Sequence, residues 1–418
     1  MSKAERQREH HIPLRVADLV QKLADEPAVT IFEREQFRQL CQLVEATIHH
    51  EYRSRLEELK TAYAPFDPDS DARAQYELSS DDRQARCRRL FDRFDALLMR
   101  ANYRRLSRED LEEALRSPSD TGLRLHLDLS LFEHLEIYVR GACQLSRVHS
   151  SWRTRWREVS RQVAGYRRLA VIFRLKNRSK RTEPLDTRSV VLKLFKDIPQ
   201  QDVETLLPGA NVRIGWWEQA QIVLPTLSGI GLTLLKLLKG AAAVAFAGIY
   251  GLVAFLGLVS GVIGYGVRSF YTYLRTREKH QLCLTRHLYF QNLDNNVGVI
   301  YHLLAEAEEQ EFREIILAWW LLWRGGMAGA TSRQLDRAAE AWLQERCGID
   351  ADFEVADALA KISRLGLAHA SPTGRWQAHS IEAALETLDR AWDEHFSYHR
   401  PEAQTEATAQ PRIWRRAA

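Results

Sequence analysis

The sequence predicts a mainly α-helical protein with a small α+β module, a transmembrane helical hairpin and a C-terminal winged-helix-like domain. Three observations support this fold class. Apolar residues recur at helical spacing in the first 120 residues, and alternating or β-branched patterns replace them between 121 and 217. The third observation is a run of 28 uncharged residues between Lys239 and Arg268, in a chain whose mean hydropathy is −0.36.

The N-terminal region, residues 1–120, is expected to be helical. The stretches "VADLVQKLA", "EREQFRQLCQLVEATIHHEYRSRLEELKTAY" and "DDRQARCRRLFDRFDALLMRANY" place apolar residues three and four apart, as on one helix face. "PFDPDSD" separates the last two helices, because proline and aspartate favour turns. Ser107 and Asp110 have the spacing of a helix-capping signature, so another helix is expected to begin there.

Residues 121–217 are expected to form a small basic α+β module. "LEIYVRG", "YRRLAVIFRL" and "SVVLKLF" have the alternation and β-branched content of strands. From Trp152 to Lys196 there are 14 Lys or Arg residues against 3 Asp or Glu residues. The sequence leaves two interpretations of this basic block open. It could face anionic lipid or nucleic acid, or it could be a solvated face of sheet and loop.

The segments 222–238 and 241–267 predict the transmembrane hairpin. About 20 apolar residues cross a hydrocarbon core of about 30 Å, and the second segment is long enough with some tilt. Basic residues flank the pair on both sides, which favours both flanks in the cytoplasm and hence two crossings. Lys236 and Lys239 at the predicted turn weigh against the hairpin, so a single crossing stays open.

Small residues in the predicted hairpin have the spacing of close helix packing. Such residues let helix backbones approach within a membrane, within the hairpin or between protomers. The glycines expected to pack are Gly251, Gly257, Gly261 and Gly264. No ionisable residue lies in 241–267, which argues against a proton or ion pathway through one monomer.

A polar helical connector, residues 268–311, is expected to lead to a winged-helix-like domain at 312–395, followed by a disordered tail at 396–418. The domain prediction comes from the order of three helical patterns and a strand, turn and strand: "FREIILAWWLLW", "SRQLDRAAEAWLQERCG", "DADFEVADALAKISRLG" and "LAHASPTGRWQAH". Thr331 or Ser332 is expected to cap the second helix.

The third helix of this domain is net acidic. A winged helix that reads DNA needs a basic third helix to meet phosphates. Here the acids Asp352, Glu354 and Asp357 outnumber Lys361 and Arg364. The sequence therefore favours a protein-contact or structural role over DNA reading, and nucleic acid is not the expected partner.

Several blocks in order resemble the transmembrane protein 143-like family, which is defined by a domain of unknown function. The resemblance covers about residues 8–395 and rests on the number of blocks rather than on one motif: "REHHIP", "LKTAYAPFDPDSD", "RANYRRLSREDLEEAL", "VLKLFKDIPQQDVETLLPG", "LYFQNLDNNVGVI" and "LDRAAEAWL…FEVADALAKISRLGL". It implies an integral membrane protein with soluble regions on both sides of a short transmembrane section, and it implies no known activity. No catalytic residue is carried over from it.

The segment "QNLDNN" is the most polar candidate interaction site. Its amides and acid could bind a polar head group or the backbone of a partner, or they could cap and connect two helices, which is the favoured interpretation. The residues concerned are Gln291, Asn292, Asp294, Asn295 and Asn296.

Two patterns suggest metal binding, and neither is expected to bind a metal. Asp67, Asp69 and Asp71 alternate as in a calcium loop, but the glycine and glutamate of an EF-hand are replaced by Ala72 and Leu78. A second group has no sequence feature that brings its members together: His10, His11, His49, His50 and Glu51.

Acidic residues at 306–311 look like a carboxylate cluster but are more simply explained as the charged face of an amphipathic helix: Glu306, Glu308, Glu309 and Glu311. The sequence shows no nucleotide-binding glycine loop, nucleophile elbow or zinc-protease motif, and it predicts no cofactor, metal or catalytic residue.

These patterns predict a membrane-anchored scaffold or interaction protein whose partners are the lipid bilayer and a protein, either another protein or a second copy. The five scattered cysteines indicate reduced thiols, and the first 13 residues lack the apolar core of a signal or organellar presequence. The expected localisation is therefore a bacterial inner membrane, multi-pass, with cytoplasmic domains. Two alternatives stay open: a tethered nucleic-acid binder using the basic block, and an unrecognised membrane-surface enzyme.

Overall fold

The computed structural model of the chain is described for most of the residues outside the predicted hairpin. The described residues are 8–27, 29–70, 79–107, 109–110, 124–127, 129–150, 158–176, 187–208, 210–213, the single positions 260, 264 and 271, and 290–395. The predicted hairpin at 222–267 thus lies outside the described residues except at two positions. The predicted tail at 396–418 lies outside them as well.

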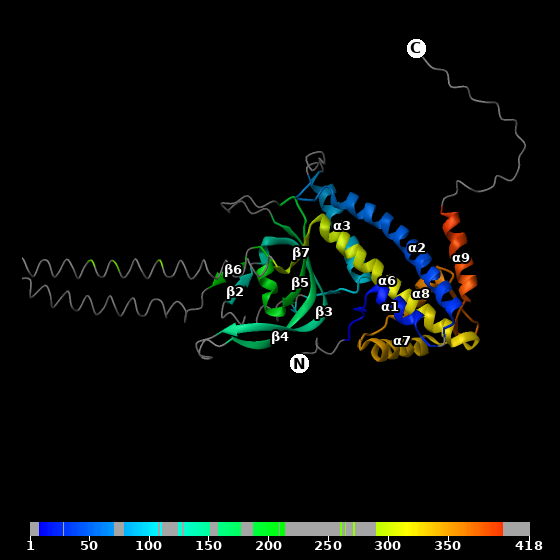
Figure 1. The fold of residues 1–418 in the computed structure, drawn as a ribbon. Coiled ribbons are helices and arrows are strands. Elements are labelled where there is room, and N and C mark those ends of the chain that lie inside the picture. Colours follow the sequence, from blue (N-terminus) through cyan, green and yellow to red (C-terminus); the bar gives the residue numbers. More distant parts are fainter. Residues whose placement is uncertain are drawn as a thin grey trace, which may run out of the picture. The chain divides into compact units, whose positions relative to one another are not determined.

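The described part of the chain is mixed α/β, which corrects the predicted mainly α fold class (Figure 1). Its seven α-helices are α1 (Val16–Ala24), α2 (Ile31–Tyr63), α3 (Ser80–Arg100), α6 (Val297–Gly325), α7 (Ser332–Cys347), α8 (Val355–Arg364) and α9 (Ile381–Glu394). Its strands are β1 (Arg104–Arg105), β2 (Arg124–Leu127), β3 (Phe132–Ser150), β4 (Glu158–Leu175), β5 (Val191–Pro199), β6 (Ala210–Arg213), β7 (Asn292–Asn295), β8 (Ala368–Ala370) and β9 (Trp376–Ala378). Short 3₁₀ turns are η3 (Leu129–Leu131), η5 (Gln200–Leu206) and η6 (Gly326–Ala328).

The chain divides into two compact units. Unit 1 comprises Met1–Glu9 and Leu56–Ala305, and unit 2 comprises His10–Arg55 and Glu306–Ala418. Helices α2 and α6 therefore each supply residues to both units.

Unit 1 is built on a five-stranded antiparallel sheet with the order β1-β3-β4-β5-β7. The β3–β4 hairpin is its longest part, because these two strands stay paired out to Ser150 and Glu158. β5 pairs with β4 only between Gly165 and Phe173, so the hairpin extends beyond the rest of the sheet (Figure 1). A separate pair, β2 with β6, is also antiparallel.

The two faces of this sheet have different coverings, because side chains alternate along a strand. On one face, apolar residues of β3, β4 and β5 such as Ile137, Val171 and Phe195 form a core with Leu206 and other residues of η5. On the other face, α3 contacts β3: Phe91 packs on His134, Asp95 binds Tyr138, and Arg140 donates a hydrogen bond to the carbonyl oxygen of Ala101.

Unit 2 contains α1, the N-terminal part of α2, most of α6, α7, α8, the β8–β9 hairpin and α9. A bridge between Ala330 and Trp376 ties the segment before α7 to the hairpin. Thr331 is the residue that caps α7, and its bonds with Gln334 form a capping box. The winged-helix-like description of 312–395 stays a prediction.

The fold class was wrong for two physical reasons. The outer strands β1 and β7 are short and polar, so their sequences carry no hydrophobic alternation, and they lie outside the predicted module at 121–217. Their pairing partners are distant in sequence, such as Lys193 for Asn295. Hydrophobic patterns within a short stretch of sequence do not predict pairings between strands that are distant in sequence.

The predicted transmembrane hairpin and multi-pass inner-membrane localisation are also corrected. Across the described residues, none of the helices combines the length and the apolar character needed to cross a bilayer. Helix α6, with 29 residues, is long enough, but charged residues interrupt it between Glu306 and Glu314. The membrane part of the predicted fold class is therefore not retained.

Candidate functional site

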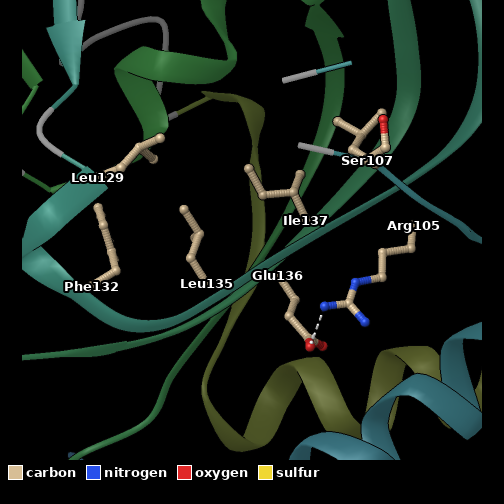
Figure 2. A pocket seen from close by; sticks show the side chains of 8 residues that line it. Arg105, Ser107, Leu129, Phe132, Leu135, Glu136 and Ile137 are labelled. Atoms are coloured by element: carbon tan, nitrogen blue, oxygen red, sulfur yellow. Dashed lines mark ion pairs between the residues drawn. The ribbon is translucent and has the colours of Figure 1, made fainter. Parts of the chain in front are cut away.

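A cavity of about 530 Å³ lies in unit 1 beside the early part of β3. β1 pairs with β3 only at Tyr138 and Val139, so the preceding residues of β3 form one wall of this cavity. Figure 2 shows its lining side chains around one space. They are Arg105, Leu106, Ser107, Leu129, Phe132, Leu135, Glu136 and Ile137.

The cavity combines an apolar wall with one ion pair at its edge. Arg105 Nη2 lies 2.7 Å from Glu136 Oε1 (Figure 2). Tyr138 places its hydroxyl 2.7 Å from Glu136 and 2.8 Å from Asp95. Burial raises the pKa of the Tyr138 hydroxyl above its usual range, and both carboxylates raise it further. The phenol therefore stays protonated and acts as a hydrogen-bond donor, and Tyr138 is not among the side chains that line the cavity.

Ser107, at the edge of the cavity, forms the predicted capping signature with Asp110, and residues 111–123, which include the rest of the predicted helix, lie outside the described residues. The Ser107 backbone N–H donates to Asp110 Oδ2 at 3.1 Å, and the Asp110 N–H donates to Ser107 Oγ at 3.0 Å. The predicted cap is confirmed.

The predicted polar site at 291–296 forms β7 and the corner that leads into α6. Asn296 has a left-handed conformation, with φ of 49°. Its side-chain oxygen accepts a hydrogen bond from the Leu192 N–H, and Tyr63 places its hydroxyl 3.2 Å from the same oxygen. Its amide Nδ2 donates to Asp69 Oδ2 at 2.6 Å. Asn296 therefore joins the sheet, α2 and the turn after α2.

The other residues of this segment have separate contacts. Gln291 donates to the Asp197 carbonyl oxygen, and Asp294 lies 3.0 Å from Nδ1 of His302. The Asn292 side-chain oxygen is buried and has no hydrogen-bond partner in the described part of the chain. Asn295 is exposed.

The "DPDSD" and "QNLDNN" segments meet, which sequence reasoning missed. Asp67 accepts a hydrogen bond from the Asp69 N–H, as in a turn, and Asp69 binds Asn296. Asp71 lies outside the described residues. A turn motif and a strand end that are 227 residues apart carry no local signal of this contact. Within the described ranges, no group of three His, Cys, Asp or Glu side chains is arranged to hold a metal ion.

The four histidines of the second candidate group have different neighbours. Nδ1 of His10 lies 3.1 Å from the Asp352 carbonyl oxygen, and Nδ1 of His11 lies 3.1 Å from Oε1 of Gln310. His49 is 2.9 Å from Glu308. His50 packs against the rings of Trp392 and His395. The structure does not gather them into one site.

The acidic segment of α6, predicted to be the charged face of an amphipathic helix, is partly internal. Glu311 and Glu314 each have 2% exposed surface. Glu311 accepts hydrogen bonds from Tyr52 at 2.7 Å and Arg364 at 3.0 Å. Glu314 pairs with Lys361 at 2.6 Å. We call these five residues the buried charge network of unit 2.

Burial and the neighbouring charges together set the direction of the pKa shifts of Glu314 and Lys361. Burial raises the pKa of Glu314, and the charge of Lys361 opposes that shift. Burial works to lower the pKa of Lys361, but Glu314, Glu311 and Asp357 outweigh it and raise the pKa. Sequence periodicity alone missed this network because its members come from α2, α6 and α8.

The basic block does not form one continuous face in the described residues. Arg174 is buried and lies 3.4 Å from Glu133. Lys193 is half-buried on the sheet, and burial lowers its pKa. Arg168 is partly exposed and Lys196 is exposed, on the face that carries Arg140.

Residues 166–298 match the model of a family described as "Protein of unknown function (DUF3754)". The matched range begins in β4 and includes β5, η5, β7 and the start of α6. No solved structure matches the chain.

The predicted helix-packing glycines remain largely untested. Gly251, Gly257 and Gly261 lie outside the described residues. At Gly264 an added Cβ would meet no atom within 4 Å.

Three large apolar side chains of unit 2 are exposed. Ile31 is 86% exposed, Phe32 69% and Met327 89%. Ile31 and Phe32 begin α2, and Met327 follows α6 in η6. We call these three residues the apolar tip.

Proposed function

We propose that this protein is an interaction protein that docks a protein partner through the apolar tip of unit 2. The single observation that supports this is the exposure of three large apolar side chains, between 69% and 89%, on fixed backbone. Scattered exposed apolar residues are ordinary, but a group of them marks an interaction site. Aromatic residues and methionine are also enriched in protein interfaces.

The three side chains belong to one end of unit 2. Phe37 stacks on Trp319 with ring centroids 6.1 Å apart, and Tyr52 binds Glu311. The residue nearer the start of α2 contacts the residue nearer the end of α6, and the later residue of α2 contacts the earlier residue of α6. The two helices are therefore antiparallel. The start of α2 therefore lies at the end of α6 that leads into Met327.

The backbone of the apolar tip is held in place from both sides. Thr30 and Glu33 exchange hydrogen bonds at the start of α2, as in a capping box. Arg375 donates to the carbonyl oxygens of Ala328 and Gly329, and Gln377 donates to that of Met327. A preorganised surface loses less conformational entropy on binding, which favours docking.

The charges of α8 support a protein partner over nucleic acid. Lys361 is paired with Glu314 and Asp357, and Arg364 with Glu51 and Glu311. These cations are neutralised inside unit 2, so they offer little attraction to phosphates.

The resemblance to the transmembrane protein 143-like family stays a proposal that rests on the sequence blocks. The matched family model supports only a domain of unknown function. The membrane attachment implied by the resemblance is not part of the proposed function.

Site-specific photo-crosslinking of the full chain tests the proposal. A photoreactive residue at position 32 is expected to give one discrete crosslinked protein in the producing cells. The same residue at position 99 is the control, because Met99 is 55% exposed in unit 1. Adding Met327→Asp is expected to abolish the product at position 32, since it places a charge in the apolar contact.

Purified protein separates the two classes of partner. A product of twice the chain mass in the purified sample indicates self-association, and a product seen only in cells indicates another protein. A product that forms equally from positions 32 and 99, or that survives Met327→Asp, would contradict docking at the apolar tip.

A further inference from the structure

The sheet of unit 1 has an open edge at the cavity. β1 is followed along β3 only as far as Leu106, whose N–H donates to the Ile137 carbonyl oxygen at 2.8 Å. Ser107 then exchanges hydrogen bonds with Asp110, and helical residues begin at 109, so the chain leaves the sheet at this point. β1 therefore does not cover the edge of β3 before Ile137, and this part of β3 lines the cavity.

The main chain of Leu135 faces the open edge. In an antiparallel sheet, the N–H and C=O groups of successive residues point alternately to the two neighbouring strands. Ile137 directs its carbonyl oxygen to β1, and β3 keeps an unbroken register with β4 from His134 to Arg140. Leu135, two residues before Ile137, therefore directs its N–H and C=O to the same side. Among the described residues, neither group has a hydrogen-bond partner there.

Apolar side chains surround this open main chain. Leu129, Phe132 and Leu135 line the cavity together with Leu106 and Ile137 (Figure 2). Leu129 and Leu135 are partly buried and pack against the core of the sheet. A ligand that covers them gains apolar contact, but it also removes water from the N–H and C=O of Leu135. It must therefore supply hydrogen bonds to both groups.

The charged side chains of the lining leave no net charge in the cavity. They are Arg105 and Glu136, and they are paired with each other at 2.7 Å. A free carboxylate or ammonium group on a ligand would be repelled by one member of this pair. The charge of the cavity is therefore matched by an uncharged occupant.

We propose that the cavity binds an extended, uncharged peptide segment of a partner protein, which pairs with β3 as an added strand where β1 ends. The segment exchanges two main-chain hydrogen bonds with Leu135. Its residue opposite Leu135 places an apolar side chain against Leu129 and Phe132, because directly opposite residues of paired strands project from the same face. In strand addition, main-chain hydrogen bonds give affinity and side-chain pockets give specificity.

Two further observations fit this occupant. The volume of about 530 Å³ lies in the usual range of ligand cavities, which is about 300–1,000 Å³. The cavity belongs to unit 1, whereas the apolar tip belongs to unit 2. Strand addition at β3 is therefore a separate interaction from docking at the apolar tip.

Fluorescence anisotropy of the full chain with a labelled peptide tests the proposal. The probe is the peptide Thr-Val-Leu-Val-Thr with both ends blocked and an uncharged coumarin label. N-methylation of its central leucine removes the N–H that points to Leu135, and we expect it to weaken binding at least about tenfold. N-methylation of the next valine is the matched control. That N–H points away from β3, so binding should be unchanged.

Substitutions in the chain locate the peptide. Leu129→Asp is expected to weaken binding about tenfold or more, because it places a charge in the apolar lining. Met99→Asp is the matched control, since Met99 is 55% exposed in unit 1 and does not line the cavity. Met327→Asp, at the apolar tip, should also bind the peptide as the unchanged chain does.

The two methylated peptides are tested on the unchanged chain, so the proposal stays testable even if Leu129→Asp folds poorly. Absence of binding by the unmodified peptide would overturn it. Equal binding of the two methylated peptides would show that the main chain of Leu135 does not pair with the ligand. Unchanged binding by a folded Leu129→Asp variant would place the peptide elsewhere, and either result would also overturn the proposal.

Discussion

Lys361 and Glu314 form a buried ion pair inside unit 2. Replacing Lys361 with Met keeps most of the side-chain volume and removes the ammonium. We expect the free energy of unfolding to fall by about 3–5 kcal/mol, because the Glu314 carboxylate stays buried without its partner. Urea unfolding at pH 7 measures this change.

The double variant Lys361→Met with Glu314→Met is the control for that prediction. Replacing both members of a buried pair with apolar residues is often nearly neutral. The double variant should therefore recover most of the lost stability. A double variant no more stable than the single one would show that the pair itself does not account for the loss.

The pH dependence of Lys361→Met has a defined sign. Burial raises the pKa of the Glu314 carboxyl above its ordinary value, and loss of Lys361 removes an opposing influence. A carboxyl group with a raised pKa binds its proton more tightly in the folded state, so folding loses stability as pH rises above the unfolded pKa. The deficit relative to the unchanged chain should be smaller at pH 4.5 than at pH 7. An equal deficit at both values would contradict this account.

Asn296 gives a second prediction at the residue scale. Asn296→Asp keeps the shape and tolerates the left-handed backbone, but it removes the amide donor to Asp69 and places two carboxylates together. We expect a loss of about 1–3 kcal/mol of unfolding free energy. Asn295→Asp is the matched control because Asn295 is exposed, and it should change stability little. Equal losses in both variants would contradict the role given to Asn296.

At the scale of elements, the middle of β3 depends on a glycine. Gly141 has φ of 77°, and an added Cβ would lie 2.7 Å from Cβ of Arg167 on β4. Gly141→Ala should therefore incur both the left-handed backbone penalty and a steric clash. Gly374→Ala is the control, with φ of 73° and open space around its Cβ. The unfolding temperature should fall more for Gly141→Ala than for Gly374→Ala. An equal fall would mean that β3 and β4 move apart at this point without loss of stability.

Helices and their caps were largely predictable from the sequence, because the signals are local. Thr331 caps α7, and Ser107 exchanges hydrogen bonds with Asp110, both as expected. The strands β3, β4 and β5 also carry readable alternation. The outer strands β1 and β7 do not, since their identity depends on pairing with distant partners.

Candidate sites were less predictable for the same reason. The polarity of residues 291–296 marks them as a candidate site, but the contact of Asn296 with Asp69 depends on the fold. Charges on α6 look like a solvated face until α8 places Lys361 and Arg364 over them. The exposure of a residue depends on which other element packs against it. The periodicity of apolar residues describes one helix and does not show which element covers it.

At the scale of the whole molecule, two buried cysteines report on the two units separately. Cys41 belongs to unit 2 and Cys87 to unit 1, and both are free. Burial raises the pKa of each thiol, so little reactive thiolate is present in the folded chain. Brief alkylation in increasing urea, read by mass spectrometry, therefore measures the opening of each unit.

The two substitutions argued at the residue scale should act on different cysteines. Lys361→Met weakens unit 2, so Cys41 should become reactive at lower urea while the Cys87 midpoint changes less. Asn296→Asp weakens unit 1 and should give the reverse order, because Asn296 and Asp69 both belong to unit 1. If both cysteines shift together in both variants, the units unfold as one cooperative body, and the stability of each network is then a property of the whole chain.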